Sequence, residues 1–274
     1  MRQCNYFQFL KNFEPKDIEI LLENKKVPIK YRENKDDCLE FYEDFSSKGI
    51  FTIKIIFRKK LISCEKLFYK CQNITEINCS FFDCSQVSTS KNMFSNCTGL
   101  KKIDLGNNNF ELCTNFESMF HECKELEILD VSNFNTENST TFESMFEGCL
   151  KLNNIDVSKF DSSRCTIVRN MFKNCKSLVS IDLINWDMKN IGNGKEHSID
   201  EMFANCKKLK NIKMNLNFQD EKRLMIKELF NNNYTFPSIF QGISKSGSFT
   251  YKGRMPDFIL REFTRSWEII NFNS

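Results

Sequence analysis

Four aspartates stand 26 residues apart along the chain and are the side chains most able to act together chemically: Asp104, Asp130, Asp156 and Asp182. If a repeated fold stacks them, their carboxylates lie roughly 4.8 Å apart and repel by about 1 kcal/mol or less per pair in water. The simplest interpretation is a solvated acidic strip whose carboxylates accept hydrogen bonds from serines or backbone N–H groups. A second is a strip that binds a basic protein. A third is calcium binding, although the ion takes roughly six to eight oxygens and one column offers few.

Residues at both ends extend the aspartate column, and a second outward-facing column runs beside it. Asn78 precedes it and Lys213 follows it at the same position of the motif. Two residues before each aspartate, a second outward position holds Lys102, Ile128, Asn154 and Ser180. Because these residue types differ from copy to copy, they favour a varied contact surface over a catalytic pocket. We therefore predict a protein-contact strip with these members: Asp104, Asp130, Asp156, Asp182, Lys102, Asn154 and Lys213.

Other reactive residue types form no recognisable site. Neither histidine belongs to a metal or catalytic motif: His121 has no second histidine four residues on and is expected to be exposed, and His197 lies in a glycine-containing insertion that we interpret as a flexible loop. The 13 cysteines include no Cys-x-x-Cys pair and no zinc spacing. We predict no catalytic residue, no cofactor and no metal site.

The aspartates belong to a repeat. The string Met-Phe-x-x-Cys-x-x-Leu-x-x-Ile/Leu-Asp, or a close variant, begins at residues 67, 93, 119, 145, 171 and 202, in steps of 26 and once of 31. Each copy ends in an alternating apolar segment typical of a short strand. The apolar spacing of 142, 145, 146 and 149 before it predicts a helical turn. One copy cannot bury both apolar faces, whereas stacked copies can, so the sequence predicts a solenoid with parallel strands.

Stacking turns each repeated position into a column. One column holds phenylalanines: Phe68, Phe94, Phe120, Phe146, Phe172 and Phe203. A second holds buried thiols that we expect to be inert packing residues: Cys71, Cys97, Cys123, Cys149, Cys175 and Cys206. A third aromatic column holds Phe82, Phe134, Phe160 and Trp186, with Asn108 out of pattern and Phe110 two residues further on.

The motif from Met145 to Phe160 resembles the BspA-type leucine-rich repeat proteins of the DUF285 class, over about residues 50–214. The resemblance implies a curved α/β solenoid with parallel strands on its concave face and short helical turns on the other side. Members of the class are often surface proteins that bind host proteins or one another. The resemblance therefore implies a protein partner for the curved face.

The ends of the array must cap the apolar faces of the terminal coils. We predict an N-terminal helical cap over residues 1–49, with a helix that starts near Pro15 and a second over 36–47. The solenoid of about seven coils covers 50–214, and 50–57 is its first strand. The C-terminal cap covers 215–274, with helices over 220–230 and 257–267 and a strand at 249–251.

Charge and composition exclude several classes of protein. The net charge is +3, with +3 over residues 1–60, −2 over 61–213 and +2 over 214–274. This charge is too small for binding to the phosphate backbone of a nucleic acid. No apolar stretch approaches the roughly 20 residues of a spanning helix. The first residues contain no apolar core of a secretory signal, so we expect a cytoplasmic protein with reduced thiols; the cell surface is the alternative that the family resemblance implies.

We predict a non-enzymatic scaffold that binds a protein through its curved face, because a catalytic site needs a convergent pocket. A homo-oligomer formed through an end coil is a further interpretation. The alternatives are a surface adhesin exported without a conventional signal, and a metal-binding protein or enzyme that uses the aspartate column.

Overall fold

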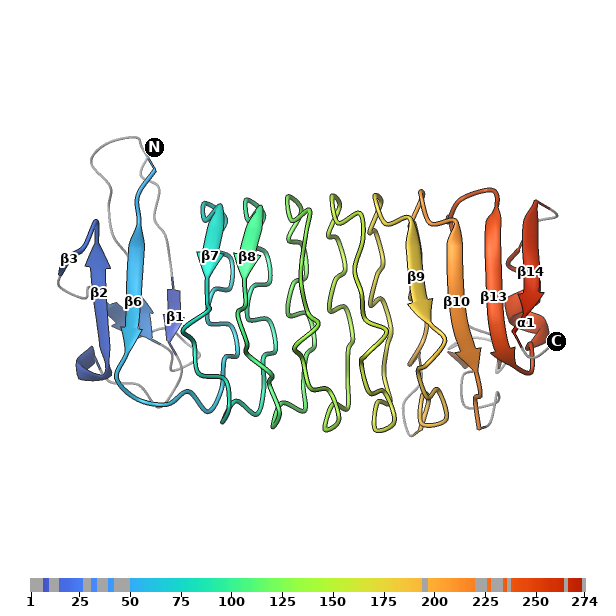
Figure 1. Ribbon diagram of the computed structural model, residues 1–274, viewed down its shortest axis with the longest axis horizontal. Coiled ribbons are helices and arrows are strands. Elements are labelled where there is room, and N and C mark those ends of the chain that lie inside the picture. The colour runs from blue at the N-terminus through green and yellow to red at the C-terminus, as the bar shows by residue number, and fades with distance from the viewer. Residues whose placement is uncertain are drawn as a thin grey trace.

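The coils of the chain stand side by side in one long row, with small sheets at the N-terminal end (Figure 1). The computed structural model describes residues 7–9, 15–26, 31–33, 39–41, 50–193, 197–219, 226–227, 234–235, 238–263 and 266–272. Within these ranges it is rich in strands and contains one short α-helix. The N-terminal elements are β1 (Phe7–Phe9), a 3-10 helix (Pro15–Asp17), β2 (Ile18–Leu22), β3 (Lys25–Lys26), β4 (Tyr31–Glu33), β5 (Leu39–Phe41) and β6 (Ile53–Phe57). The row itself carries β7 (Glu76–Asn78), β8 (Lys102–Asp104), β9 (Ser180–Leu183), β10 (Asn211–Leu216), β11 (Ile226–Lys227), β12 (Tyr234–Thr235), β13 (Gly247–Gly253), α1 (Asp257–Leu260) and β14 (Trp267–Asn271).

Parallel pairing joins successive coils, as predicted. Strand β7 pairs with β8, and β9, β10, β13 and β14 form one parallel sheet in that order. On another side of the coils, single parallel bridges link Thr89 to Asn115, Asn115 to Thr141, and Thr141 to Ile167. The two middle coils therefore belong to the same stack, although residues 128–131 and 154–157 form no assigned strand.

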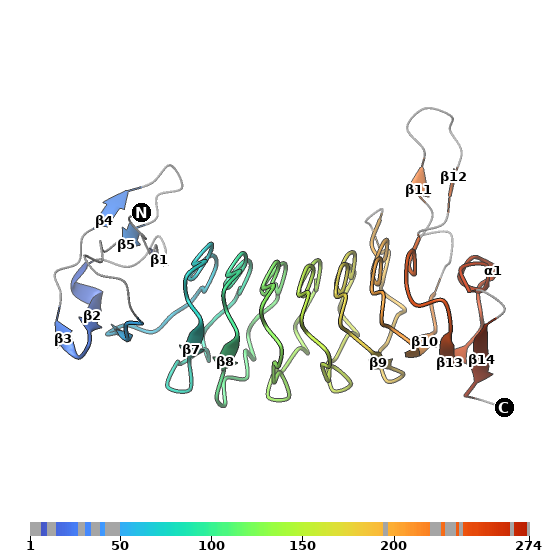
Figure 2. The same cartoon turned by 90° about the horizontal axis from the view of Figure 1, so that it is seen from above.

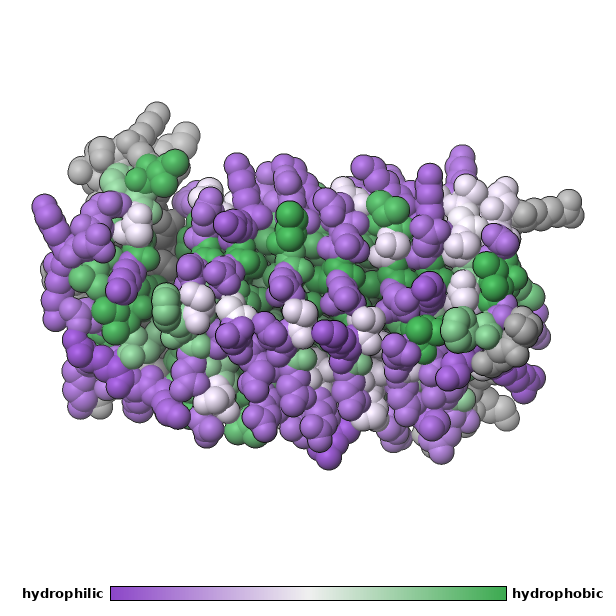
Figure 3. All heavy atoms as spheres, in the orientation of Figure 1, coloured by the Kyte–Doolittle hydropathy of each residue, from purple (hydrophilic) through white to green (hydrophobic). Residues whose placement is uncertain are grey.

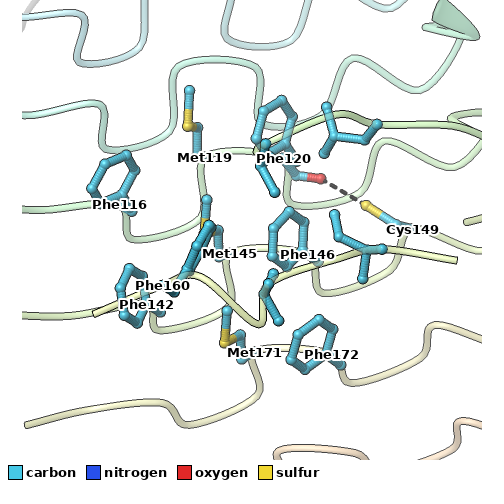
Figure 4. Close-up of a cluster of buried hydrophobic side chains, with 14 of the residues drawn as sticks. Phe116, Met119, Phe120, Phe142, Met145, Phe146, Cys149, Phe160, Met171 and Phe172 are labelled. Carbon is cyan, nitrogen blue, oxygen red and sulfur yellow. Dashed lines mark hydrogen bonds between the residues drawn. The ribbon is translucent and has the colours of Figure 1, made fainter. Parts of the chain in front are cut away.

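The phenylalanine column is confirmed. Neighbouring rings lie nearly parallel, with centroids 5.4 to 5.8 Å apart from Phe68 to Phe203. Figure 4 shows three of these rings, Phe120, Phe146 and Phe172, in one line. The column continues to Phe240, whose ring is 5.5 Å from that of Phe203. Residues 239–240 therefore form a further, divergent copy of the motif that the sequence pattern missed.

The third aromatic column is also confirmed, with an exchange in one coil. Phe134, Phe160 and Trp186 stack with centroids 6.3 Å apart. In the preceding coil Asn108 is buried, and its amide donates to the carbonyl oxygens of Cys79 at 2.9 Å and of Leu105 at 2.7 Å. The ring of Phe110 takes the apolar space instead, 4.7 Å from Phe134.

The segments before the strands are turns; the structure does not show the predicted helical turns. In the central copy, the N–H of Met145 bonds three residues back to Phe142, but the N–H of Phe146 bonds to Met171 in the next coil. Two residues of the segment, Ser144 and Gly148, have φ of 53° and 75°. A helix needs every residue right-handed and every N–H bonded within the segment, so this alternation prevents one.

The predicted helix after Pro15 is wrong beyond its first residues. Pro15–Asp17 form a 3-10 helix, but Ile18–Leu22 form strand β2, which pairs antiparallel with β6. Ile18 and Ile20 are buried and Glu19 between them is half-buried. Burial therefore alternates from residue to residue, as in a strand, and does not follow the helical spacing of the apolar residues in the sequence. Strand β6 is the predicted strand at 50–57, yet its partner is β2.

The second predicted N-terminal helix, over 36–47, is also absent where the structure describes it. Leu39–Phe41 is strand β5, which pairs antiparallel with β1 and β4. The other residues of that range lie outside the described ones. The described part of the N-terminal region is therefore made of small antiparallel sheets.

At the C-terminal end, too, the described regular elements are mainly strands. Of the predicted helix at 220–230, only Ile226–Lys227 are described, as strand β11. The predicted helix at 257–267 is limited to Asp257–Leu260, and Trp267 begins strand β14. The predicted strand at 249–251 is confirmed as part of β13, and the parallel ladder thus continues beyond residue 214.

Seen from above, the coils form a row with little bend (Figure 2). The surface that they offer is therefore flatter than the curved face that the family resemblance implies. Because each backbone segment bonds to the next coil, the row holds its outward side chains at fixed spacings.

Candidate protein-contact face

The outward side chains of the parallel strands, and of the equivalent segments 128–131 and 154–157 between them, form what we call the strand face. It consists of two positions in each coil: Glu76, Lys102, Ile128, Asn154, Ser180 and Asn211 at the first, and Asn78, Asp104, Asp130, Asp156, Asp182 and Lys213 at the second. The strand register places Asn78 beside Asp104 and Asp182 beside Lys213. Hydrophilic residues cover much of the surface in Figure 3, and apolar residues show between them along the middle of the row.

Each aspartate of the strand face closes a turn. One carboxylate oxygen accepts a hydrogen bond from the backbone N–H two residues later, at 2.9 Å for Asp104, Asp130 and Asp156 and 3.1 Å for Asp182. Asn78 makes the same bond at 2.8 Å. This geometry is the hydrogen-bonded strip of the simplest interpretation, and the turn bond uses only one of the two carboxylate oxygens of each aspartate.

The turn hydrogen bonds also stabilise the ionised form of two of these aspartates. Hydrogen bonds from Ser132 lower the pKa of Asp130, and those from Ser158 lower the pKa of Asp156. The neighbouring Asp156 opposes the shift at Asp130, as expected for stacked like charges. At the end of the column, the Lys213 ammonium lies 3.1 Å from a carboxylate oxygen of Asp182. Asp130 and Asp156 are therefore ionised at neutral pH, and Lys213 neutralises part of the negative charge at one end of the column.

The other predicted contact residues are exposed and lie where expected. Lys102 belongs to β8 and stands beside Glu76 of β7. Asn154 is exposed in the middle of the row, and Ile128 is 75% exposed although it is a large apolar side chain. Three neighbouring coils thus present an ammonium group, an aliphatic group and an amide at equivalent positions. In the described part of the chain, no three histidine, cysteine or acidic side chains are grouped so that they could hold a metal ion.

The two histidines lie apart from the strand face and from each other. His121, predicted to be exposed, is half-buried; its Nδ1 is 3.5 Å from the Ser95 hydroxyl and its Nε2 is 4.0 Å from a Glu147 carboxylate oxygen. His197 has its Nδ1 3.5 Å from a carboxylate oxygen of Asp200. Both contacts are local links within or between coils.

The cysteine column is buried and hydrogen-bonded. From Cys97 onward, each thiol donates to the carbonyl oxygen of the motif phenylalanine in the preceding coil, as Cys149 does to Phe120 at 3.2 Å (Figure 4). The other bonds of this series measure 3.0 to 3.2 Å. Burial raises the pKa of Cys149 and of Cys206 to about 12, so both stay protonated donors at neutral pH. The thiols have the packing role that the sequence predicts.

Ion pairs between coils neutralise many charges on the turn side of the row. Lys91 lies 2.8 Å from Glu117, and Arg169 pairs with Glu143 across one coil step. Lys151 lies 2.6 Å from Glu125 in the same way. Pairs at 26-residue separations therefore fix the register of the stack in addition to the core.

A group of exposed lysines on two adjacent coils takes no part in this pairing, and the sequence did not predict it. We call it the lysine cluster: Lys176, Lys207, Lys208 and Lys210, all exposed. Lys176 and Lys207 directly follow the motif cysteines of adjacent coils, and Lys210 precedes β10. Among the described residues, no carboxylate lies within ion-pair distance of these four ammonium groups. The signal in the sequence was the local run Lys-Lys-Leu-Lys at 207–210.

No helix in the described ranges has the length and apolar character needed to cross a membrane. The sequence model of one protein family, described as Mycoplasma protein of unknown function, DUF285, matches residues 62–178 and again 101–214. The two matches together span residues 62–214, more than half of the chain. Searches of curated proteins and of solved structures find no match for this sequence.

Proposed function

The chain belongs to the DUF285 family, and on that premise we propose that it is a non-enzymatic scaffold that binds a protein partner through its strand face. The supporting observation is the regular display of unlike side chains. Lys102, Ile128 and Asn154 occupy one position of three successive coils, on a backbone whose segments are bonded to one another. Such a surface recognises a partner by the order of its chemical groups along the row.

The stack also supports a closer assignment, to the BspA-type leucine-rich repeat class. The motif leucines Leu100, Leu126, Leu152 and Leu178 are fully buried, and a buried apolar residue follows three positions after each of them. Parallel strands on one side and compact turns on the other are the arrangement expected of that class. The flat row means that the partner meets a plane instead of a concave surface.

Binding without catalysis is the mechanism that the geometry supports. The strand-face aspartates lie in a line, and each already bonds to its own turn. Catalysis by acid and base requires groups that converge on one reacting atom. We assign Asp104, Asp130 and Asp156 a double role: one oxygen fixes the turn, and the other is offered to a basic or hydrogen-bonding group of the partner. The second oxygen of Asp182 is paired with Lys213.

We further propose that the protein acts in a reducing compartment, with the cytoplasm as the first choice. All eleven cysteines of the described residues are buried free thiols. From Cys97 onward, the thiols of the motif column donate to carbonyl groups and occupy space in the core, so oxidation would disturb the packing.

Partner capture with charge-neutral variants tests the proposal. In the double variant Asp130→Asn with Asp156→Asn, the amide oxygens keep the turn bonds and the charges are lost. The matched control is Glu137→Gln with Asp161→Asn, which removes two exposed charges elsewhere; the amide oxygen that replaces the Asp161 carboxylate can keep the bond from the Ser163 N–H.

The strand-face variant should lose the proteins that the unchanged chain retains, with an unaltered melting temperature, and the control should retain them. Equal retention by both variants, also after Ile128→Asp is added to the first, would contradict binding through this face.

A further inference from the structure

We propose that the lysine cluster is the docking site for a short acidic segment of the partner protein, an inference that rests on the proposed scaffold function. The cluster places four ammonium groups on two adjacent coils, whose spacing in a parallel stack is roughly 4.8 Å. Like charges at such distances repel by up to about 1 kcal/mol per pair in water. A partner that supplies carboxylates relieves this repulsion.

The carboxylates of the same two coils are engaged elsewhere. Within the described part of residues 171–213, Asp182 pairs with Lys213 and Glu201 pairs with Lys173. Asp187 lies 3.9 Å from Lys189, and Asp200 lies 3.5 Å from His197 and accepts a bond from the Ser238 N–H. The other described lysines of these coils, Lys173, Lys189 and Lys213, are therefore paired with carboxylates, and the lysine cluster is left for an external anion.

The backbone beneath the cluster is held on both sides. The N–H of Lys210 donates to the carbonyl of Val179 at 2.9 Å, and the carbonyl of Lys210 accepts from the Ser248 N–H at 2.6 Å. Lys176 and Lys207 have equivalent turn bonds, from their N–H groups to Asn174 and Asn205. Lys176, Lys207 and Lys210 thus extend from hydrogen-bonded backbone, which lowers the entropy cost of ordering them when an anionic partner binds.

The size of the cluster and its neighbours determine the class of the anion. The next coils along the strand face carry Asp156 and Asp130, both exposed and ionised at neutral pH. A long nucleic acid or an anionic membrane lying along the row would meet these carboxylates and be repelled. A short segment rich in Glu or Asp that lies along only one or two coils avoids them. We therefore assign the site to an acidic peptide segment.

Fluorescence anisotropy with the full chain tests this assignment. The probes are a labelled eight-residue peptide of alternating glutamate and serine, the same peptide with glutamine in place of glutamate, and an eight-nucleotide thymidine strand. The test variant is Lys207→Gln with Lys210→Gln. The control, Lys70→Gln with Lys101→Gln, removes the same charge from two exposed positions outside the strand face, and Lys101 occupies the position of Lys210 in an earlier coil.

The glutamate peptide should bind at least tenfold tighter than the glutamine peptide and should weaken as salt rises. The test variant should lose at least tenfold in affinity at an unchanged melting temperature, and the control should lose little. Equal binding of both peptides, equal loss in test and control variants, or tighter binding of the nucleotide strand would overturn the assignment.

The same variants separate this inference from the proposed function. If the Lys207→Gln with Lys210→Gln protein still captures the partner that the strand-face variant loses, the acidic docking site is wrong and the scaffold stands. If neither variant changes what is captured, both fail.

Discussion

Removing one ring of the phenylalanine column by substitution with alanine should destabilise the whole row of coils. Phe146 is fully buried, and its centroid lies 5.8 Å from that of Phe120 and 5.4 Å from that of Phe172. Replacing a buried phenylalanine by alanine costs about 3–5 kcal/mol, of which each stacked ring contact accounts for about 0.5–1.5 kcal/mol. Because a domain is stable by only about 5–15 kcal/mol, we expect Phe146→Ala to lose a large part of the free energy of unfolding.

Urea unfolding followed by far-ultraviolet circular dichroism measures this loss. Phe146→Leu keeps most of the volume and should cost about 1.5 kcal/mol, which gives a value even if the alanine variant does not fold. Ile128→Ala, at an exposed position of the same region, is the control and should change the midpoint little. A loss below about 1 kcal/mol for Phe146→Ala, at an unchanged denaturant slope, would refute the stacked column.

Three further predictions concern the turns and the C-terminal end. Both carboxylate oxygens of Glu262 accept N–H groups of the last motif copy, from Ile239 and Phe240 at 2.9 Å, and burial raises its pKa to about 7. Between pH 4.5 and about 7 the folded chain therefore keeps a proton on Glu262 that the unfolded chain has lost, so the stability should fall as pH rises through this range. Thermal melts at a series of pH values measure this dependence, and Glu262→Gln should remove it. Gly247→Ala should lower the melting temperature by several degrees, because its Cβ would overlap the Lys210 carbonyl, whereas Ser246→Ala should not. Because the pKa of Asp130 is lowered in the folded chain, its ionised carboxylate contributes stability above the ordinary aspartate pKa, and this contribution is lost as pH falls through the pKa of the folded chain. Asp130→Ala should therefore lose less stability on acidification than the unchanged chain. An equal loss of stability in both proteins would contradict the turn bond.

The repeat is what the sequence predicts best. Period 26, the columns of phenylalanine and cysteine, and the parallel strands all follow from residue types at equal intervals. They are predictable because a stack repeats the same local environment, so one physical argument holds for every copy. The divergent copy at Ile239–Phe240 was missed because its cysteine is replaced by Ile243 and the insertion before it changes the step.

The helices were predicted wrongly for two different reasons. In the turns, the apolar spacing of Phe142, Met145 and Cys149 fits a helix, but left-handed residues at Ser144 and Gly148 produce the same spacing in another backbone. Asparagine or glycine at several such positions was the available signal, since both tolerate positive φ. In the N-terminal region, Ile18–Leu22 fits either period, and its pairing with β6, far along the chain, decides for a strand.

The candidate site was predicted in part. Equal spacing placed the aspartates in one strip, and their turn bonds follow from the short polar side chain before a turn. The lysine cluster was not predicted, because a net charge of −2 over residues 61–213 hides a local excess. Only the structure shows which carboxylates of the two coils are already paired.

The most direct test of the stack measures distances along one column of the strand face. Spin labels on cysteines introduced at Glu76 and, in turn, at Ser180 or Asn211 lie four or five coil steps apart, and the described native thiols are buried. Pulsed electron–electron double resonance should give mean distances of roughly 19 and 24 Å, an increase of about 5 Å for the added coil. Distances that do not increase by this step, or a broad distribution for both pairs, would contradict the stacked row on which the binding face depends.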